Sequence, residues 1–474
     1  NWGSLPQPDD PRAANIENRP GPNDVYQVQQ NASYDLNDIN RERLNGQVVL
    51  QVRPAENLTA TIDYTYSRNT VQVRNSNVGI WFNFNDVSSS WTDGPVAGPN
   101  FYTERFGVNE GKDLSYSGSL TENRSENKSL GGNIAWDGPG GLRLELDAHH
   151  STAESGANNP YGTSTSVGTA IFGVASQTVD YTNDLPVISV DMHDGIDPFD
   201  AGNIQATGNA FRNAYFKDRI NEAQLRGSYD FDNSILDSLD FGVTFTDNKV
   251  RTAYGFLQNE TWGGTLSADE TPDDFFTPRS TSEDLQGMNG ADSPNIIPTY
   301  YNIATEQLID LLESSIGICS DPFVGVPLGE GCLAEYSVDR RLREKTLAPF
   351  VQSLHTFDLM ADEAHLRLGL RYETTDVKSS ALVPIPTGTE QSSENEIAVR
   401  YDGGAAGFTT FAGKYNNWLP AVDFDISPIN DVVLRASYSH TITRPDYASL
   451  NGGLTVNSPA RPNGGSTGGS GNPN

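Results

Sequence analysis

The sequence predicts an all-β fold, namely a transmembrane antiparallel up-and-down β-barrel with long extracellular loops. Three observations support this prediction: a repeated hairpin with one apolar and one polar face, a contrast between short links and long connections, and aromatic residues at both ends of the apolar face. The alternative is a soluble β-sandwich, in which the uncharged face would point into a core.

The hairpin is clearest at residues 43–68, where apolar residues occupy every second position of both arms. On one face lie Leu44, Gly46, Val48, Leu50 and Val52 of the first arm, and Leu58, Ala60, Ile62, Tyr64 and Tyr66 of the second. The opposite face of the second arm carries Thr59, Thr61, Asp63, Thr65 and Ser67. Because side chains alternate with period 2 along a strand, this pattern predicts two strands that share one apolar face. Pro54 and Asn57 in the link suit a turn.

Four more hairpins repeat this pattern. They lie in residues 130–148, 223–245, 347–372 and 418–438. In nine of the ten arms, the alternate positions that carry the apolar residues contain no Asp, Glu, Lys or Arg. The exception is 347–354, where Pro349 and Gln352 interrupt the alternation, so the sequence does not show which residues of this arm share the apolar face. An Arg or Lys at mid-membrane costs roughly 2–4 kcal/mol, so this absence of charge favours a lipid-facing surface. Two to four further strands are expected among residues 78–86, 113–121, 166–182 and 394–412.

Loop lengths and aromatic positions add to the prediction. Links within hairpins have about four or five residues, whereas connections between hairpins run from about 25 to about 90, as in barrels with short periplasmic turns and long outer loops. Trp136 and Phe231 adjoin short links, and Tyr66, Tyr372 and Tyr438 lie about eight residues beyond such links. At about 3.3 Å per residue and a tilt near 40°, this separation spans roughly 20 Å, close to the apolar band between aromatic girdles.

The amino-acid composition argues against several classes of function. The 474 residues have a net charge of −31, from 62 acidic and 31 basic residues, which argues against nucleic-acid binding and against polybasic attachment to anionic lipid. No stretch approaches 18 consecutive apolar residues, so no transmembrane helix is predicted. The first residues lack the charged and apolar regions of a signal peptide. We therefore expect either a cytosolic protein or a chain that begins after the start of its gene.

Several stretches resemble the barrel of TonB-dependent outer-membrane receptors. They are residues 41–43, 50–54, 58–66, 369–375, 418–421 and 434–439, and the most specific run, residues 443–447 with the sequence Thr-Arg-Pro-Asp-Tyr. The resemblance covers most of residues 40–450. It implies a partial view of a 22-stranded barrel, an N-terminal plug inside that barrel, and uptake of scarce ligands driven by the inner-membrane TonB complex. It also implies the outer membrane of a Gram-negative bacterium, with the lipid bilayer and lipopolysaccharide around the barrel.

The chain departs from the pattern of that family at both ends. No TonB box or plug-like sequence is visible, and residues 468–473 do not resemble a closing strand with a terminal aromatic. We therefore expect residues 1–474 to be a partial receptor barrel that lacks the plug and the C-terminal strands. The TonB complex would then bind through a plug outside this chain.

The longest connection, residues 255–340, has two distinctive features. Cys319 and Cys332 lie thirteen residues apart, and the oxidising cell exterior favours a disulfide that would contribute about 3 kcal/mol. Two unpaired thiols or a metal-binding pair are the alternatives, although no His or Cys companion supports a zinc site. Residues 305–315 have the spacing of a short amphipathic helix that packs on the loop itself, with a partner-binding helix as the alternative.

Aromatic residues crowd two loops and are the candidate ligand contacts, because aromatic faces stack on sugar rings and grip apolar ligands. In the first long loop they are Trp81, Phe82, Trp91, Phe101 and Tyr102, and in the longest connection Trp262, Tyr300 and Tyr301. The alternative is that these side chains pack the loops into an ordered cap. The ligand itself would be a small molecule.

One acidic cluster is a candidate calcium site in an outer loop, because its hard oxygen ligands suit Ca²⁺. It consists of Asp191, His193, Asp194, Asp197 and Asp200. The cluster lacks EF-hand spacing, and a solvated acidic loop is the alternative. His149 and His150 lie next to the end of a predicted strand. They could bind a metal as a pair, and the alternative is that they are ordinary residues of the barrel wall. No other metal or cofactor is predicted, and no phosphate loop, Cys-x-x-Cys pair or nucleophile elbow indicates an enzyme.

Three functions remain open from the sequence. The first is an outer-membrane active transporter for a scarce nutrient such as a siderophore, an oligosaccharide, a peptide or a vitamin. The second is a porin without a plug or a surface adhesin barrel. The third is a secreted β-rich glycan-binding protein, which would stay soluble without detergent.

Overall fold

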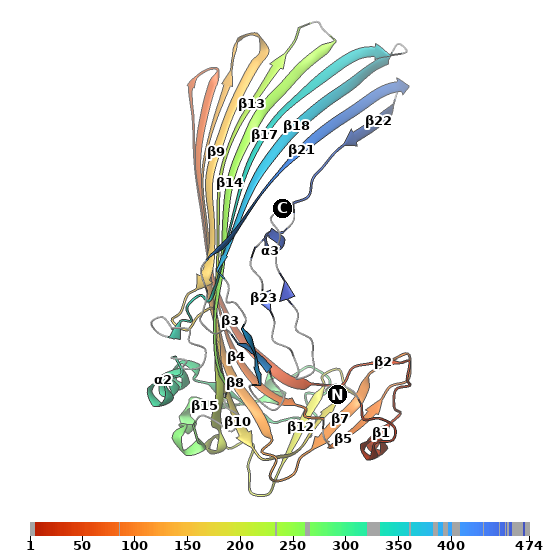
Figure 1. The fold of residues 1–474 in the computed structure, drawn as a ribbon, viewed down its shortest axis with the longest axis vertical. Helices are drawn as coiled ribbons and strands as arrows, with labels where there is room; N and C mark the ends of the chain where they lie inside the picture. Colours follow the sequence, from red (N-terminus) through yellow and green to blue (C-terminus); the bar gives the residue numbers. More distant parts are fainter. Residues whose placement is uncertain are drawn as a thin grey trace.

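The structure is a long curved antiparallel sheet with a smaller sheet at one end (Figure 1). This computed structural model describes residues 5–469 except 85, 233–234, 261–265, 320–331, 360–361, 383–386, 392–396, 401–407, 430, 445, 451, 453–454 and 457–467. The larger sheet consists of β3 (Asn31–Ala55), β4 (Leu58–Trp81), β8 (Asp113–Asp137), β9 (Leu142–Ala157), β10 (Ser164–Phe172), β13 (Gln205–Asp230), β14 (Leu236–Glu260), β17 (Val338–Leu359), β18 (Asp362–Leu382), β21 (Thr409–Ile429) and β22 (Val432–Ser439).

The strands of this sheet follow one another as antiparallel neighbours. Their order is β22-β21-β18-β17-β14-β13-β10-β8-β4-β3, and β9 also pairs with both β13 and β8. Strands β9 and β10 therefore both lie between β8 and β13. Strand β9 occupies the end near the short links, and β10 occupies the end near the long loops. The five predicted hairpins are confirmed as β3/β4, β8/β9, β13/β14, β17/β18 and β21/β22.

Two details differ from the sequence-based expectation. The links within hairpins contain two to five residues, and the first is shorter than predicted because the ladder continues to the pair Ala55–Leu58. The further strands expected in the larger sheet are extensions of the predicted ones. Residues 113–121 belong to β8, and β10 continues the position of β9.

The apolar positions of neighbouring strands lie opposite one another and form one continuous face. Ile62 pairs with Leu50, and Leu146 pairs with Leu225. These side chains are open to the surroundings, with exposed fractions of 51% for Ile62 and 46% for Leu146. A sandwich would bury such a face. Because the short helix α3 (Tyr447–Leu450) lies on the concave side and contacts the polar face, the apolar face is the convex one (Figure 1).

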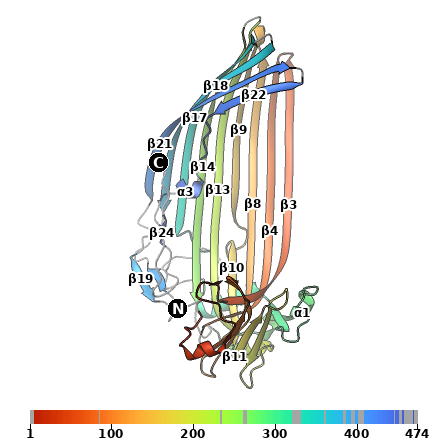
Figure 2. The ribbon, with the colours of Figure 1, turned by 90° about the vertical axis from the view of Figure 1, so that its right-hand side faces the viewer.

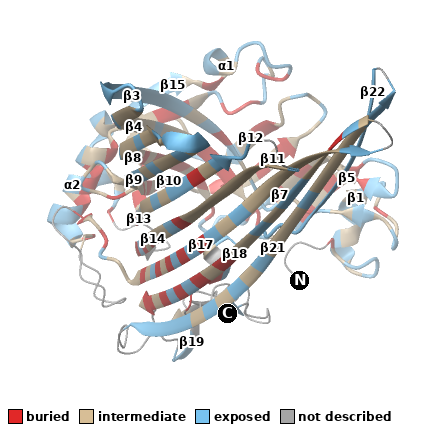
Figure 3. Cartoon of the chain, turned by 90° about the horizontal axis from the view of Figure 1, so that it is seen from above, coloured by how far each residue is buried: buried red, intermediate tan, exposed pale blue. Residues whose placement is uncertain are grey.

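The register assigns the arm that the sequence left open. In β17, Leu347 lies opposite Phe245 and Val351 lies opposite Phe241, so both belong to the convex apolar face. Phe350 has the opposite phase and lies on the concave wall. Buried, half-buried and exposed residues alternate along β17 and β18 (Figure 3).

The strands are much longer than a bilayer requires. A tilted strand crosses the hydrocarbon with about 9–11 residues, whereas β3 has 25 residues and β4 has 24. The apolar band lies near the short links, so each long strand continues well past it toward the long loops (Figure 2).

The hydrophobic core lies at the long-loop end. A smaller sheet there has the order β1-β5-β7-β11-β12. Its strands are β1 (Ile16–Glu17), β5 (Asp86–Trp91), β7 (Pro99–Arg105), β11 (Val174–Asp180) and β12 (Val187–Met192). Other elements at this end are η1 (Pro11–Asn15), β2 (Val25–Tyr26), β6 (Val96–Ala97), η3 (Ala201–Asn203), η4 (Ala268–Glu270), η5 (Asp273–Phe275), β15 (Phe276–Ser280), α1 (Thr281–Asp284), β16 (Thr299–Ile303), α2 (Thr305–Ile316), β19 (Gly388–Gln391) and β20 (Ile397–Arg400).

The larger sheet is open, so the barrel is not closed. In the part of the chain that the structure describes, β3 pairs only with β4 and β22 only with β21. The remaining short elements are η2 (Pro139–Gly141), β23 (Thr455–Val456) and β24 (Gly468–Gly469). None of the described helices is both long and apolar enough to cross a membrane.

Candidate functional site

Three of the predicted loop aromatics form the core of the smaller sheet. Its strand β5 alternates buried and half-buried residues, which turns one face inward. Phe82, Trp91 and Tyr102 each expose only 1% of their surface. The rings of Phe82 and Tyr102 meet edge to face at 4.9 Å, and Trp91 meets Tyr26 in the same way at 5.6 Å. These side chains stabilise the cap that covers the long-loop end.

Two further aromatics, Tyr300 and Tyr301 in β16, are also buried, with exposed fractions of 3% and 1%. The Tyr300 hydroxyl donates to Asp284 Oδ2 at 2.7 Å. Burial, together with the Asp284 carboxylate, raises the pKa of Tyr300 to about 12, so this hydroxyl stays protonated and remains a donor. Tyr301 meets Tyr116 edge to face at 5.0 Å, which joins the longest connection to β8.

Trp81 and Phe101 are half-buried, and Trp262 lies outside the described residues. The Trp81 indole donates to Asp113 Oδ1 at 2.6 Å, and Lys112 Nζ lies 4.3 Å from the ring centroid. Protein groups therefore contact both the edge and one face of Trp81. Packing is the role that the structure assigns to the buried aromatics, and ligand contact by any of the eight stays a prediction.

A buried ammonium group lies beside this core. Lys112 is 4% exposed, and its Nζ lies 3.5 Å from Asp113 Oδ1. Burial lowers the pKa of Lys112 to about 8, against the opposing effect of the Asp113 and Glu104 carboxylates. The cation–π contact with Trp81 supplies part of the stabilisation that water would otherwise give.

The longest connection contains the predicted disulfide and helix. Cys319 and Cys332 are bonded, with their Cα atoms 4.6 Å apart, which confirms the disulfide. The predicted helix is α2, and it buries Leu308 and Leu312 in a cluster that also includes Phe211 of β13. The loop therefore packs on the ends of the long strands as well as on itself.

The two predicted metal-binding groups are arranged differently from a ligand cage. In the acidic loop, Asp197 accepts from the Phe199 N–H at 2.8 Å and Asp200 from the Gly202 N–H at 3.0 Å, so both carboxylates stabilise turns. His149 and His150 are adjacent residues of β9, and their side chains point to opposite faces of the sheet. His150 bonds Asn221 at 2.7 Å. Calcium binding in the outer loops stays a prediction.

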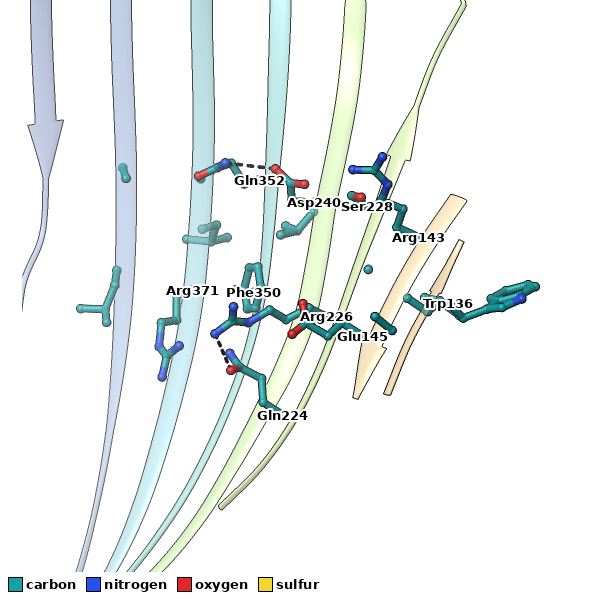
Figure 4. A pocket seen from close by; sticks show the side chains of 18 of the residues that line it. Trp136, Arg143, Glu145, Gln224, Arg226, Ser228, Asp240, Phe350, Gln352 and Arg371 are labelled. Carbon is teal, nitrogen blue, oxygen red and sulfur yellow. Dashed lines mark hydrogen bonds between the residues drawn. The ribbon is translucent and has the colours of Figure 1, made fainter. Parts of the chain in front are cut away.

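A polar basin lies on the concave wall near the short links (Figure 4). Its cavity measures about 680 Å³. Its charged and amide side chains include Arg143, Glu145, Arg226, Asp240, Gln352 and Arg371. They come from β9, β13, β14, β17 and β18, and all have the polar phase of their strands. Trp136 belongs to the apolar phase and points away from them (Figure 4).

The basin contains both signs of charge and many hydrogen-bonding groups. Arg226 donates to Gln224 Oε1 at 2.6 Å, and Gln352 donates to Asp240 Oδ2 at 3.2 Å. Such a wall can bind polar surfaces, whether of a polar solute or of a protein segment inside the barrel. The sequence indicated a polar face here, but only the register brings these residues together from five strands.

The concave wall nearer the long loops is covered by the segment that follows β22. Arg444 donates to Glu373 Oε1 at 2.7 Å, and Asn248 donates to the Tyr447 hydroxyl at 2.6 Å. The Gly452 N–H donates to Ser379 Oγ at 2.8 Å. Arg444 and Tyr447 belong to the run that resembled the receptor family most closely, and their contacts give that run a structural role.

Comparison with known proteins gives one family. A family model described as "TonB dependent receptor-like, beta-barrel" matches residues 155–474. No curated protein matches the chain, and no solved structure does. The matched range includes β10 and every later strand of the larger sheet.

Proposed function

Because the chain belongs to the TonB-dependent receptor-like β-barrel family, we propose that it forms the wall of a TonB-energised nutrient transporter. Members of this family are outer-membrane transport proteins of Gram-negative bacteria rather than enzymes. The observation that carries the proposal is the continuous apolar face of the larger sheet, which is convex, exposed and free of charge across several rows of paired strands. Lipid would cover that face.

The concave wall fits the transport role. Its basin combines guanidinium, carboxylate and amide groups, which suit the passage of a polar cargo such as a siderophore or an oligosaccharide. The same groups could bind a plug through which the TonB complex acts. In this proposal, residues 1–474 are part of a receptor barrel and residues 255–340 form an extracellular loop. Among the described loop aromatics, the half-buried Phe101 and the open face of the half-buried Trp81 would contact the ligand.

Uptake assays in living cells test this proposal. Wild-type bacteria, a strain lacking this protein and a strain lacking TonB would each receive a labelled ferric siderophore, a labelled maltooligosaccharide and vitamin B12 at nanomolar concentration. We expect uptake of one cargo to be lost in both mutant strains. Uptake that persists without TonB would indicate a passive porin instead, and protein found soluble in the medium would indicate a secreted glycan-binding protein.

A further inference from the structure

The concave wall contains a second pocket, at the place where β9 ends and β10 begins (Figure 2). Residues 158–163 lie outside both strands there, so the ladder between β8 and β13 is interrupted. The cavity measures about 340 Å³, which is at the low end of the range for small-molecule sites. We call it the junction pocket.

The register places the junction pocket on the concave wall. Phe216 and Gln224 are eight residues apart on β13, and the β13/β14 ladder between them has no register shift, so they share a face. Gln224 lines the polar basin. Ser155 pairs with both Phe216 and Ser125, which extends the same face to β8. A molecule that enters the barrel from the long loops would therefore meet this pocket before the polar basin.

The lining of the junction pocket is uncharged and offers several hydrogen-bonding groups. No Asp, Glu, Lys or Arg lines it. Its hydroxyl and amide side chains are those of Thr121, Asn123, Ser155, Thr163 and Ser164. Asn123 Oδ1 is buried, and no residue that the structure describes donates a hydrogen bond to it. Because a buried acceptor without a donor is costly, this oxygen suits a hydroxyl group of a ligand.

Open aromatic rings lie beside these polar groups. Phe216 lines the pocket, and Tyr254 is its diagonal neighbour on β14, since Phe216 pairs with Thr252. The exposed fractions of Phe216 and Tyr254 are 36% and 39%. The Phe256 ring lies 6.4 Å from that of Tyr254 and nearly parallel to it, at 16°. The Arg212 guanidinium lies 5.1 Å from the Phe256 centroid, so the protein itself covers part of that third ring.

The convex side of the same stretch of β14 is closed. Ala253 and Leu257 are 5% and 1% exposed. Between them, a Cβ atom on Gly255 would clash with the carbonyl oxygen of Glu335, because the longest connection lies against the strand. Packing therefore accounts for the convex residues at this level, whereas it leaves the concave rings of Phe216 and Tyr254 uncovered.

We infer that the junction pocket binds a sugar ring of a neutral oligosaccharide that passes through the barrel. A sugar ring has an apolar face of C–H groups and an edge of hydroxyl groups. The rings of Phe216 and Tyr254 suit the face, and the carbonyl oxygen of Asn123 suits the edge. A charged cargo such as a ferric catecholate would meet no counter-ion in the lining.

The inference rests on the proposed function, because it requires the concave wall to line a transport path. It narrows the cargo, which the proposed function leaves as a siderophore or an oligosaccharide, to an uncharged oligosaccharide. The polar basin, with its guanidinium and carboxylate groups, would then receive the sugar after the junction pocket.

A matched pair of variants tests the inference on the full-length protein purified from outer membranes in mild detergent. The test variant is Phe216→Leu/Tyr254→Leu, which keeps apolar side chains but removes both flat rings. The control variant is Tyr229→Leu/Phe245→Leu, which makes the same two changes on the same two strands at convex positions that are 36% and 42% exposed. The mobility shift between unheated and heated samples would verify that both variants fold.

Isothermal titration calorimetry would measure the binding of maltohexaose, cellohexaose and xylohexaose, with a ferric catecholate siderophore as the charged probe. We expect the wild type and the control to bind at least one of the three oligosaccharides. The test variant should bind it about tenfold more weakly, which corresponds to about 1.4 kcal/mol, because the leucine side chains have no aromatic face.

Equal binding of the oligosaccharide by the two variants would overturn the inference, and so would a wild type that binds none of the three oligosaccharides. A wild type that binds only the siderophore and imports it with the help of TonB refutes the inference alone. Oligosaccharide uptake that persists without TonB refutes the proposed function instead.

Discussion

At the scale of single residues, the cap at the long-loop end depends on a charge that is removed from water. Lys112 lies between the Trp81 and Phe106 rings, with Nζ 4.3 and 5.5 Å from their centroids. Its ammonium lies 3.5 Å from the Asp113 carboxylate, and the Glu104 carboxylate also acts on it. Burying an ammonium group is costly unless it is paired, so the pKa of Lys112 falls.

This pKa predicts how the cap responds to pH. The folded pKa of Lys112 is about 8 and the ordinary value is 10.5, so between these values the unfolded cap binds more protons than the folded one. The stability of the cap should therefore rise by about 3 kcal/mol as the pH increases from 8 to 10.5. Below pH 8 the cost of burying the charge is present in full.

Hydrogen exchange of the amides of β5, β7 and β11 measures this effect. We expect the rise in protection in the wild type but not in Lys112→Met, which has no titrating group at this position. The control Lys128→Met removes an ammonium that is 48% exposed and should behave as the wild type does. The same pH dependence in wild type and Lys112→Met would contradict the prediction.

At the scale of elements, each long strand has two different environments along its length. Near the short links, its alternate residues lie on the exposed apolar face and on the concave polar wall, and near the long loops the strands join the cap. Adjacent residues of one strand should therefore respond to different extents to the same charged substitution. Leu225 and Gln224 of β13 are such a pair, because Leu225 is on the convex face and Gln224 lines the polar basin.

We predict that Leu225→Arg destabilises the folded barrel by about 2–4 kcal/mol, since its guanidinium would lie in hydrocarbon. Gln224→Arg should cost less than about 1 kcal/mol, because its side chain faces a polar wall. Folding yield in liposomes as a function of urea concentration measures both. Equal losses for the two variants would show that the convex face does not meet lipid.

At the scale of the whole molecule, the concave wall is covered by different parts at its two ends. The polar basin near the short links is open, whereas the segment after β22 binds the wall nearer the long loops. Arg444 secures this segment through Glu373, whose side chain is only 5% exposed. Without Arg444, that carboxylate would keep only Arg371, at 3.2 Å.

Arg444→Gln should therefore release the segment around α3, with a loss of about 1.5–3 kcal/mol in the free energy of its local opening. Amide exchange of residues 446–452 should accelerate about tenfold or more, while exchange in β18 stays slow. Arg435→Gln, at an exposed position of β22, is the control for the loss of charge. Unchanged exchange in Arg444→Gln would mean that Leu450 and its apolar neighbours hold the segment alone.

The sequence by itself determined the five hairpins, their apolar face and the disulfide. Period-2 alternation and the spacing of two cysteines are local properties, and a lipid-facing surface tolerates so little charge that the pattern is clear without any contact. Family resemblance then indicated the same barrel that the family model matches over residues 155–474.

Only the tertiary structure decided which side chains meet. Cross-strand register assigned Leu347 and Val351 to the convex face, and it brought polar side chains of β9, β13, β14, β17 and β18 together in the polar basin. The burial of Trp91 and Tyr301 was likewise outside the reach of the sequence, since an aromatic residue in a loop can pack or bind, and the choice depends on what surrounds it.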